Sequence, residues 1–106
     1  MGTKARHRPE RLAEKLVQIR LALGLSQNAM LKHLEADEEL TQNVFSNYEL
    51  GKREPPLILL LRYARAANVY LEAIVDDSLD LPDKLPSPTK SEGIRRKSPA
   101  RSQTKR

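Results

Sequence analysis

The chain has 106 residues, enough for one small domain, and contains no cysteine, which excludes disulfides and thiolate metal sites. Its net charge is +5, yet between residues 9 and 83 eight cations stand against thirteen acids, so the excess of Lys and Arg lies at the ends. The longest apolar run, "LILLL", is too short to cross a bilayer, and the first ten residues lack the apolar segment of a secretory signal. We therefore expect a cytoplasmic protein without a membrane partner (nucleoid-associated if bacterial), with an acidic domain and basic ends.

Five helices are predicted along the chain. The first begins at Pro9, which suits the first helical position, and it ends at Gly24. One face of this helix is apolar at helical spacing and holds Leu12, Leu16, Ile19 and Leu23. Ser26 can cap the second helix, whose apolar residues are Met30, Leu31 and Leu34. The third helix runs from a cap at Thr41 to Gly51 and carries Val44, Phe45 and Tyr48.

The fourth helix is expected over about residues 57–67, closed by Asn68 in a left-handed conformation, and a short fifth helix over about residues 71–75. Short helices joined by short polar loops are typical of an all-α fold. The domain therefore covers residues 9–77. The flanking segments are a flexible basic arm over 1–8, an extended linker over 78–85 that can pack through Leu79, Leu81 and Leu85, and a disordered basic tail over 86–106.

The exposed face of the third helix carries neutral polar side chains where surface helices usually carry Glu and Lys: Gln42, Asn43, Ser46 and Asn47. Amides bond bidentately to adenine in the major groove of DNA, and a neutral amide is not repelled by phosphate. The first turn of a recognition helix is the part that enters the groove. Gln42 and Asn43 occupy that turn, and Asn47 follows one turn later. The pattern predicts base reading by these three residues, although it also suits an ordinary solvated face.

Three segments together resemble the Cro/repressor-type helix-turn-helix domain of the xenobiotic-response-element (XRE) class of regulators: "LGLSQNAML", "TQNVFSNYELGKREPP" and "LLRYARAANVYLEAIV". Leu25-Ser26-Gln27 opens the second helix, and Glu49-x-Gly51-Lys52 closes the third. A proline and Leu57-x-x-Leu60-Leu61 follow, with Leu71 in the fifth helix. The resemblance covers about residues 11–76.

This resemblance implies a compact five-helix lambda-repressor-like domain that binds double-stranded DNA, usually as a dimeric transcription regulator, without catalysis or a cofactor. In the family, the positions matching Gln42, Asn43 and Asn47 read bases. The positions matching Gln27, Thr41, Lys52 and Arg53 contact phosphate, and Ser26 and Ser46 are assigned to the DNA backbone with them.

The turn between the second and third helices departs from the family pattern. The segment "LEADEEL" is about four residues longer than usual and carries four acids: Glu35, Asp37, Glu38 and Glu39. Two interpretations stay open. Either Thr41 caps the third helix and the turn bulges away from DNA, or Asp37 caps a longer helix and the amides lie deeper in it.

Partners other than DNA are also open. Leu57 is expected in the core, so Ile58 and Leu59 must point elsewhere and are assigned to a dimer interface. The tail can add affinity for phosphate or bind a protein partner. The acidic core favours, as the alternative function, a protein-interaction module or an antitoxin-type regulator on the same fold. Catalysis is not expected, because the sequence has two distant histidines, no metal motif and no glycine-rich phosphate loop.

Overall fold

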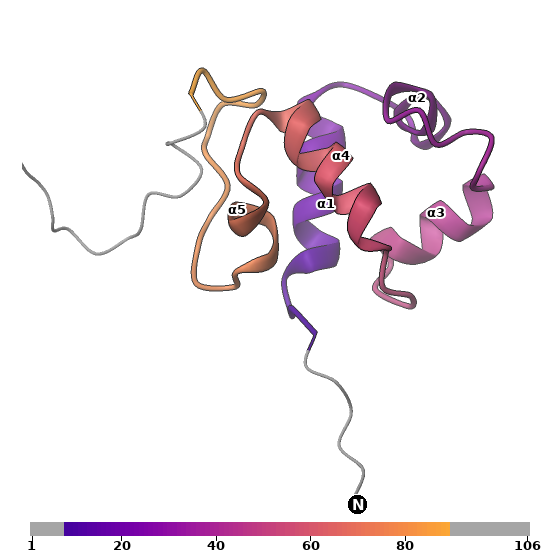
Figure 1. Ribbon diagram of the computed structural model, residues 1–106, viewed down its shortest axis with the longest axis horizontal. Helices are drawn as coiled ribbons and strands as arrows, with labels where there is room; N and C mark the ends of the chain where they lie inside the picture. The colour runs from indigo at the N-terminus through magenta and orange to yellow at the C-terminus, as the bar shows by residue number, and fades with distance from the viewer. Residues whose placement is uncertain (1–7, 90–106) are drawn as a thin grey trace, which may run out of the picture.

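The structure is a computed structural model that describes residues 8–89, so the arm over residues 1–7 and the tail over residues 90–106 lie outside the described part. Within that part the chain forms helices and no strand: α1 (Leu12–Ala22), α2 (Gln27–His33), α3 (Gln42–Glu49), α4 (Leu57–Ala67) and α5 (Leu71–Val75). The expected all-α fold is thus confirmed. In Figure 1, α1 and α4 cross in the middle, α2 and α3 lie at one end, and α5 lies at the other.

Helix ends fall where local chemistry places them. Ser26 and Thr41 cap α2 and α3, because their hydroxyls accept hydrogen bonds from backbone N–H groups of the first turn. Gly24 and Gly51 follow α1 and α3 with φ of 73° and 77°, where the left-handed backbone lets the last carbonyls find donors. Asn68 takes the same conformation after α4 with φ of 56°, as the sequence predicts.

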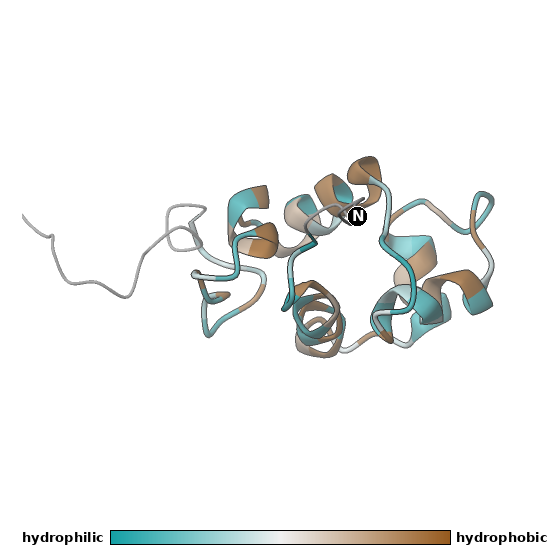
Figure 2. Cartoon of the chain, turned by 90° about the horizontal axis from the view of Figure 1, so that it is seen from below, coloured by the Kyte–Doolittle hydropathy of each residue, from teal (hydrophilic) through white to brown (hydrophobic). Residues whose placement is uncertain are grey.

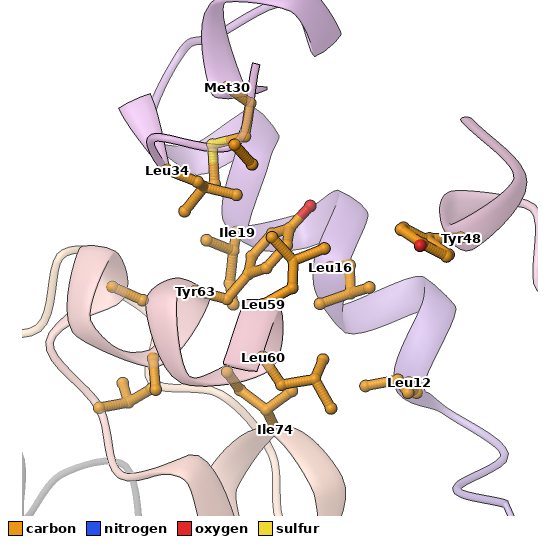
Figure 3. Close-up of a cluster of buried hydrophobic side chains, with 14 of the residues drawn as sticks. Leu12, Leu16, Ile19, Met30, Leu34, Tyr48, Leu59, Leu60, Tyr63 and Ile74 are labelled. Atoms are coloured by element: carbon orange, nitrogen blue, oxygen red, sulfur yellow. The ribbon is translucent and has the colours of Figure 1, made fainter. Parts of the chain in front are cut away.

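The core is built between α1 and α4 and is closed on one side by α3 (Figure 3). Leu16 and Ile19 are fully buried, and Phe45 stacks on Tyr63 with ring centroids 6.2 Å apart. The Tyr63 hydroxyl is buried and has no hydrogen-bond partner among the described residues. Burial raises the pKa of this phenol far above its usual value, so it stays neutral.

The apolar face of α4 differs from the sequence prediction by part of a turn. Leu57 is 69% exposed and Leu59 is 2% exposed, so the first lies in solvent and the second in the core. The buried positions of α4 repeat at helical spacing and comprise Leu59, Leu60, Tyr63, Ala64 and Ala67. Because Tyr63 and Ala67 must face the core, the helix turns Leu57 outward. The expectation that Leu57 lies in the core is wrong, and so is the expectation that Leu59 points to the surface.

A segment of residues 76–81, here called the C-terminal strap, packs against α1 through buried Leu79 and Leu81. Two of the three leucines by which this linker is predicted to pack, Leu79 and Leu81, are thus buried. Lys15 of α1 is fully buried beneath the strap and donates to three backbone carbonyls, those of Ala73, Asp76 and Leu79, at 2.9, 2.9 and 2.8 Å. Burial lowers the pKa of this ammonium group, because the charged form loses its hydration.

The strap also holds the residues that lead into α1. The Asp77 carboxylate accepts from the backbone N–H groups of Glu10 and Arg11 at 2.8 and 3.0 Å, directly before the first helical residue, Leu12. The Arg11 guanidinium then donates to the carbonyls of Asp77 and Leu79 and pairs with Asp80 at 2.9 Å. The start of α1 and the strap therefore form one hydrogen-bonded unit.

The ordered chain continues beyond the strap. Ser87 is buried, and its N–H group donates to the carbonyl of Ala67 at 2.8 Å, at the end of α4. The Asn68 amide donates to the carbonyl of Ser87 at 2.7 Å. Ser87, which the sequence places in the predicted disordered tail, is thus bonded to the end of α4.

No helix in residues 8–89 is long and apolar enough to span a membrane. The longest helices, α1 and α4, have 11 residues each. Figure 2 shows that brown apolar and teal polar residues also follow one another along the helices.

Candidate nucleic-acid interface

The two helices with the predicted DNA contacts, α2 and α3, pack against each other at one end of the molecule (Figure 1). Thr41 Oγ1 accepts from the N–H group of Val44 at 3.2 Å, and Gln42 is the first residue of α3. Of the two residues expected to cap the third helix, Thr41 is therefore the one that does so. Gln42 and Asn43 therefore occupy the first turn of α3, as the shorter helix requires.

The turn before α3 is held against α4. Glu35 follows α2 with φ of 59°, and the next residue, Ala36, is fully buried and anchors the turn. Arg62 of α4 donates to the carbonyls of Leu34 and Glu35 at 3.4 and 3.2 Å, and its guanidinium lies 3.6 Å from the Glu39 carboxylate. The acids of the turn are exposed: Glu35, Asp37, Glu38 and Glu39. The acidic turn (residues 35–39) is thus an exposed but fixed feature, with Glu39 directed to α4.

A chain of hydrogen bonds runs from α1 to the first residue of α3. Arg20 holds the Glu49 carboxylate through two nitrogens, at 2.8 and 3.0 Å. The same carboxylate accepts from Gln27 Nε2 at 3.0 Å, and Gln27 Oε1 accepts from Gln42 Nε2 at 3.1 Å. The Arg20 and Glu49 side chains are 15% and 5% exposed, so the pair is largely desolvated. The hydrogen bond to Glu49 raises the pKa of Arg20, which keeps its charge.

This chain fixes the Gln42 amide without saturating it. Gln42 uses one N–H bond toward Gln27 and keeps its carbonyl oxygen and its second N–H bond. An adenine edge needs one acceptor and one donor from an amide, and these are the two groups that remain. Gln27 uses its carbonyl oxygen and one N–H bond within the protein and keeps its second N–H bond. Its predicted phosphate contact is therefore compatible with both of these bonds.

The roles of Arg20 and Glu49 were not predicted from the sequence. One signal was present: Glu49 ends α3, where a negative charge opposes the helix dipole and is unfavourable unless it is paired. An acid at that position therefore indicates a nearby cation. Which cation supplies the pair depends on how α1 crosses α3, and helical periodicity does not contain that information.

The other predicted DNA-contacting residues fall on the same end of the molecule. Asn43 and Thr41 are exposed, whereas Ser46 and Asn47 are half-buried. Lys52 and Arg53 are exposed in the connector after α3, and their backbone N–H groups donate to the carbonyl of Asn47 at 2.9 and 3.3 Å.

Ser26 Oγ accepts from the N–H group of Ala29 at 3.1 Å, as a cap does. A hydroxyl in this role still has its own proton to donate to a phosphate. The cap and a backbone contact are therefore compatible at this position.

Of the two residues predicted to form a dimer interface, one lies at the surface and the other does not. Ile58 is 53% exposed, but Leu59 is buried and cannot meet a partner without unfolding α4. Leu57 takes its place on the surface, beside a hollow of about 470 Å³ that Pro55, Pro56 and Leu60 also line.

In residues 8–89 no three His, Cys, Asp or Glu side chains gather as a metal site would require. Comparisons with protein-family models, with curated proteins and with solved structures found no match for this chain.

Proposed function

We propose that this protein binds double-stranded DNA sequence-specifically as a helix-turn-helix transcription regulator of the XRE class, working in the cytoplasm and without catalysis. In this proposal α3 enters the major groove, with Gln42, Asn43 and Asn47 against base edges. The connector residues Lys52 and Arg53 and the α2 and α3 hydroxyls contact the backbone.

The observation that carries the proposal is the fixed Gln42 amide. An ordinary solvated face has no need for a side chain held by a desolvated ion pair through a second glutamine. Holding the amide before binding lowers the entropy lost on binding, because its rotamers are already restricted. The two unused groups of the amide match the pattern that adenine presents in the major groove.

Alanine substitutions in the protein test the base contacts when the DNA motif that each variant selects is compared with that of wild type. Each bidentate pair is worth about 1–3 kcal/mol of discrimination, so Gln42→Ala is expected to relax the preference at one position in each half-site. Lys52→Ala is expected to weaken all sequences about equally, since phosphate contacts carry no base information. Gln18→Ala is the matched control, because Gln18 is an exposed glutamine on α1. If Gln42→Ala, Asn43→Ala and Asn47→Ala all select an unchanged motif, α3 is not the reading helix.

Dimerisation belongs to the same proposal. Leu57 and Ile58 are large apolar side chains exposed side by side at the start of α4. Burying them against a second copy recovers about 25 cal/mol per Å² of apolar surface. A two-fold dimer that reads successive major grooves places its two α3 helices about 34 Å apart and requires a near-palindromic site.

Light scattering tests whether Leu57 and Ile58 form the dimer interface. Wild type is expected to be dimeric at tens of micromolar, and Leu57→Glu/Ile58→Glu is expected to be monomeric. The double substitution Leu21→Glu/Leu50→Glu is the control, because those leucines are also exposed but lie outside α4. A wild-type protein that stays monomeric both alone and on its selected duplex would contradict the dimer.

The second candidate function is a protein-interaction module. The observation that favours it is the exposed acidic turn directly before α3, since carboxylates near phosphate weaken DNA binding. An antitoxin-type regulator combines both functions, with DNA on the domain and a protein partner on the basic tail. A protein adapter forms no competitor-resistant complex with any duplex, whereas both kinds of regulator do.

A further inference from the structure

A hollow of about 380 Å³, here called the α1–α3 hollow, lies between the start of α1, the end of α3 and the connector (residues 50–56) that follows α3. The connector runs close to α1 there, since a Cβ added at Gly51 would lie 3.7 Å from the Ala13 Cβ. Ligand pockets occupy about 300–1,000 Å³, so this hollow is at the small end of their range. At about 30 Å³ for each water-sized group, it has room for about a dozen non-hydrogen atoms.

The floor of the α1–α3 hollow is apolar. Leu12 and Pro55 line it and are buried, and Ala13 lines it and is half-buried. Figure 3 shows Leu12 of α1 and Tyr48 of α3 on one side of the core cluster. An organic molecule in the hollow therefore meets carbon on this side, and burial of its own apolar part favours binding.

The Tyr48 side chain supplies a polar group that has no partner in the fold. Tyr48 is 6% exposed and lines the α1–α3 hollow, yet its hydroxyl makes no hydrogen bond with the described residues. Unlike the Tyr63 hydroxyl, it is not fully enclosed by protein. Since a buried tyrosine usually has a partner for its hydroxyl, the partner of Tyr48 must come from the hollow.

Two arginines border the α1–α3 hollow with most of their donors unused. The Arg8 guanidinium donates to the carbonyl of Gly51 at 3.4 Å, which occupies one of its five N–H groups. The backbone N–H group of Arg53 donates to the carbonyl of Asn47 at 3.3 Å, whereas its guanidinium has no partner among the described residues. The backbone at Arg53 is thus held, and the charged end of the side chain is left for a ligand.

The charges around the α1–α3 hollow match one negative charge. Glu10 and Glu54 line it together with Arg8 and Arg53. Glu54 already interacts within the chain, so a ligand meets two guanidinium groups and the Glu10 carboxylate, a net of one positive charge. A carboxylate carries one negative charge and matches the planar fork of a guanidinium, whereas a phosphate monoester carries about −1.5 to −2.

We infer that the α1–α3 hollow binds a small organic monocarboxylate and that the bound acid competes with DNA. The carboxylate lies between the Arg8 and Arg53 guanidinium groups and accepts from the Tyr48 hydroxyl, and the apolar part lies on the floor. The competition rests on the proposed function, in which Arg53 contacts phosphate. An acid that occupies the Arg53 guanidinium removes this contact, and DNA must weaken binding of the acid by the same factor.

Binding without DNA tests the site by itself. Backbone NMR spectra of the full-length protein are recorded with acetate, hexanoate, phenylacetate and 2-phenylethanol, each at about 10 mM, or ten times the expected Kd. Hexanoate and phenylacetate are expected to bind with a Kd of about 1 mM and to shift the amides of Ala13, Gly51 and Arg53. Acetate lacks the apolar part and 2-phenylethanol lacks the charge, so both are expected to bind at least about tenfold more weakly.

Substitutions around the α1–α3 hollow assign the shifts to it. Arg8→Gln and Arg53→Gln are each expected to weaken both acids about tenfold, because bonds between charged groups are the strong ones. Tyr48→Phe removes only the hydroxyl and should weaken them about threefold. Arg65→Gln is the matched control, because Arg65 is an exposed arginine of α4 that lines a different hollow. If neither acid shifts these amides, or if both arginine variants bind the acids as wild type does, the hollow is not a carboxylate site.

Binding to the duplex that wild type selects tests the competition. Saturating phenylacetate is expected to lower the slope of log K against log salt by about 0.9, the value of one phosphate contact, with acetate at equal concentration as the control for ionic strength. Arg53→Gln should have the lower slope already and should not respond. An unchanged wild-type slope with the acid bound would contradict the competition. If wild type selects no duplex, the proposed function and the competition fail, whereas the amide shifts still decide the carboxylate site.

Discussion

The two ends of the domain use polar side chains in opposite ways. At the end formed by α1 and the C-terminal strap, polar groups face inward and bind the backbone, as Lys15, Arg11 and Asp77 do. At the end formed by α2 and α3, the polar chain that starts at Glu49, whose side chain is 5% exposed, runs outward and finishes on exposed Gln42. Polar side chains that are hydrogen-bonded to the backbone stabilise the fold and are unavailable to a ligand. The difference supports the proposal that the α2–α3 end is the one that binds a ligand.

The substitution with the largest expected effect tests the inward end. Lys15→Met keeps the length of the side chain but removes three hydrogen bonds from a charged donor, those to the carbonyls of Ala73, Asp76 and Leu79. Stability is expected to fall by about 4 kcal/mol, because each hydrogen bond from a charged group is worth about 1.5–3 kcal/mol. Urea unfolding measures it, with exposed Lys32→Met on α2 as the control. A loss below 1 kcal/mol would mean that the strap does not depend on Lys15.

The next substitution is expected to affect both the stability of the domain and the positioning of Gln42. Glu49→Ala removes the acceptor of both Arg20 and Gln27, so stability is expected to fall by about 3 kcal/mol, as when one partner of a buried ion pair is lost. Unlike Lys15→Met, it should also weaken the base preference at the Gln42 position, because Gln27 is no longer held. Selection at a temperature where both variants are fully folded provides the comparison. If both variants retain the wild-type motif, the polar chain does not position Gln42.

The smallest effect concerns the acidic turn. Glu35 has a left-handed backbone, which costs a residue with a Cβ about 1 kcal/mol and costs glycine almost nothing. Glu35→Gly is therefore expected to raise the free energy of unfolding by up to about 1 kcal/mol, while also removing one acid near α3. Glu38→Gly is the control, since its φ is not positive. A destabilised Glu35→Gly protein would show that the side chain contributes more than its strain costs.

Local signals in the sequence account for most of the fold. Ser26, Thr41, Gly24, Gly51 and Asn68 set the helix ends through their own backbone preferences, so those boundaries were predictable. The face of α4 that is buried was not predictable, because "LILLL" places apolar residues on every side of the helix. The packing of Tyr63 and Ala67 decides which of these residues face the core. Five consecutive apolar residues leave the helical period ambiguous.

The candidate site was predictable in its residues but not in its connections. The amides of α3 stand out from composition, whereas the ion pair that positions Gln42 joins residues 29 positions apart. Lys15 carries a weak signal, since it shares the apolar face of α1 with Leu12 and Ile19, three and four positions away. Its partners are backbone carbonyls about sixty residues later, and a backbone carbonyl has no signature in the sequence.

Selection of bound duplexes from random DNA tests the central claim most directly, that the outward end reads bases through α3. The full-length wild-type protein is expected to enrich a short near-palindromic motif, with two half-sites about one turn of DNA apart and adenine at the position that Gln42→Ala relaxes. Recovery of a pool with no motif, bound only at low salt, would contradict sequence-specific binding and favour a protein-interaction module.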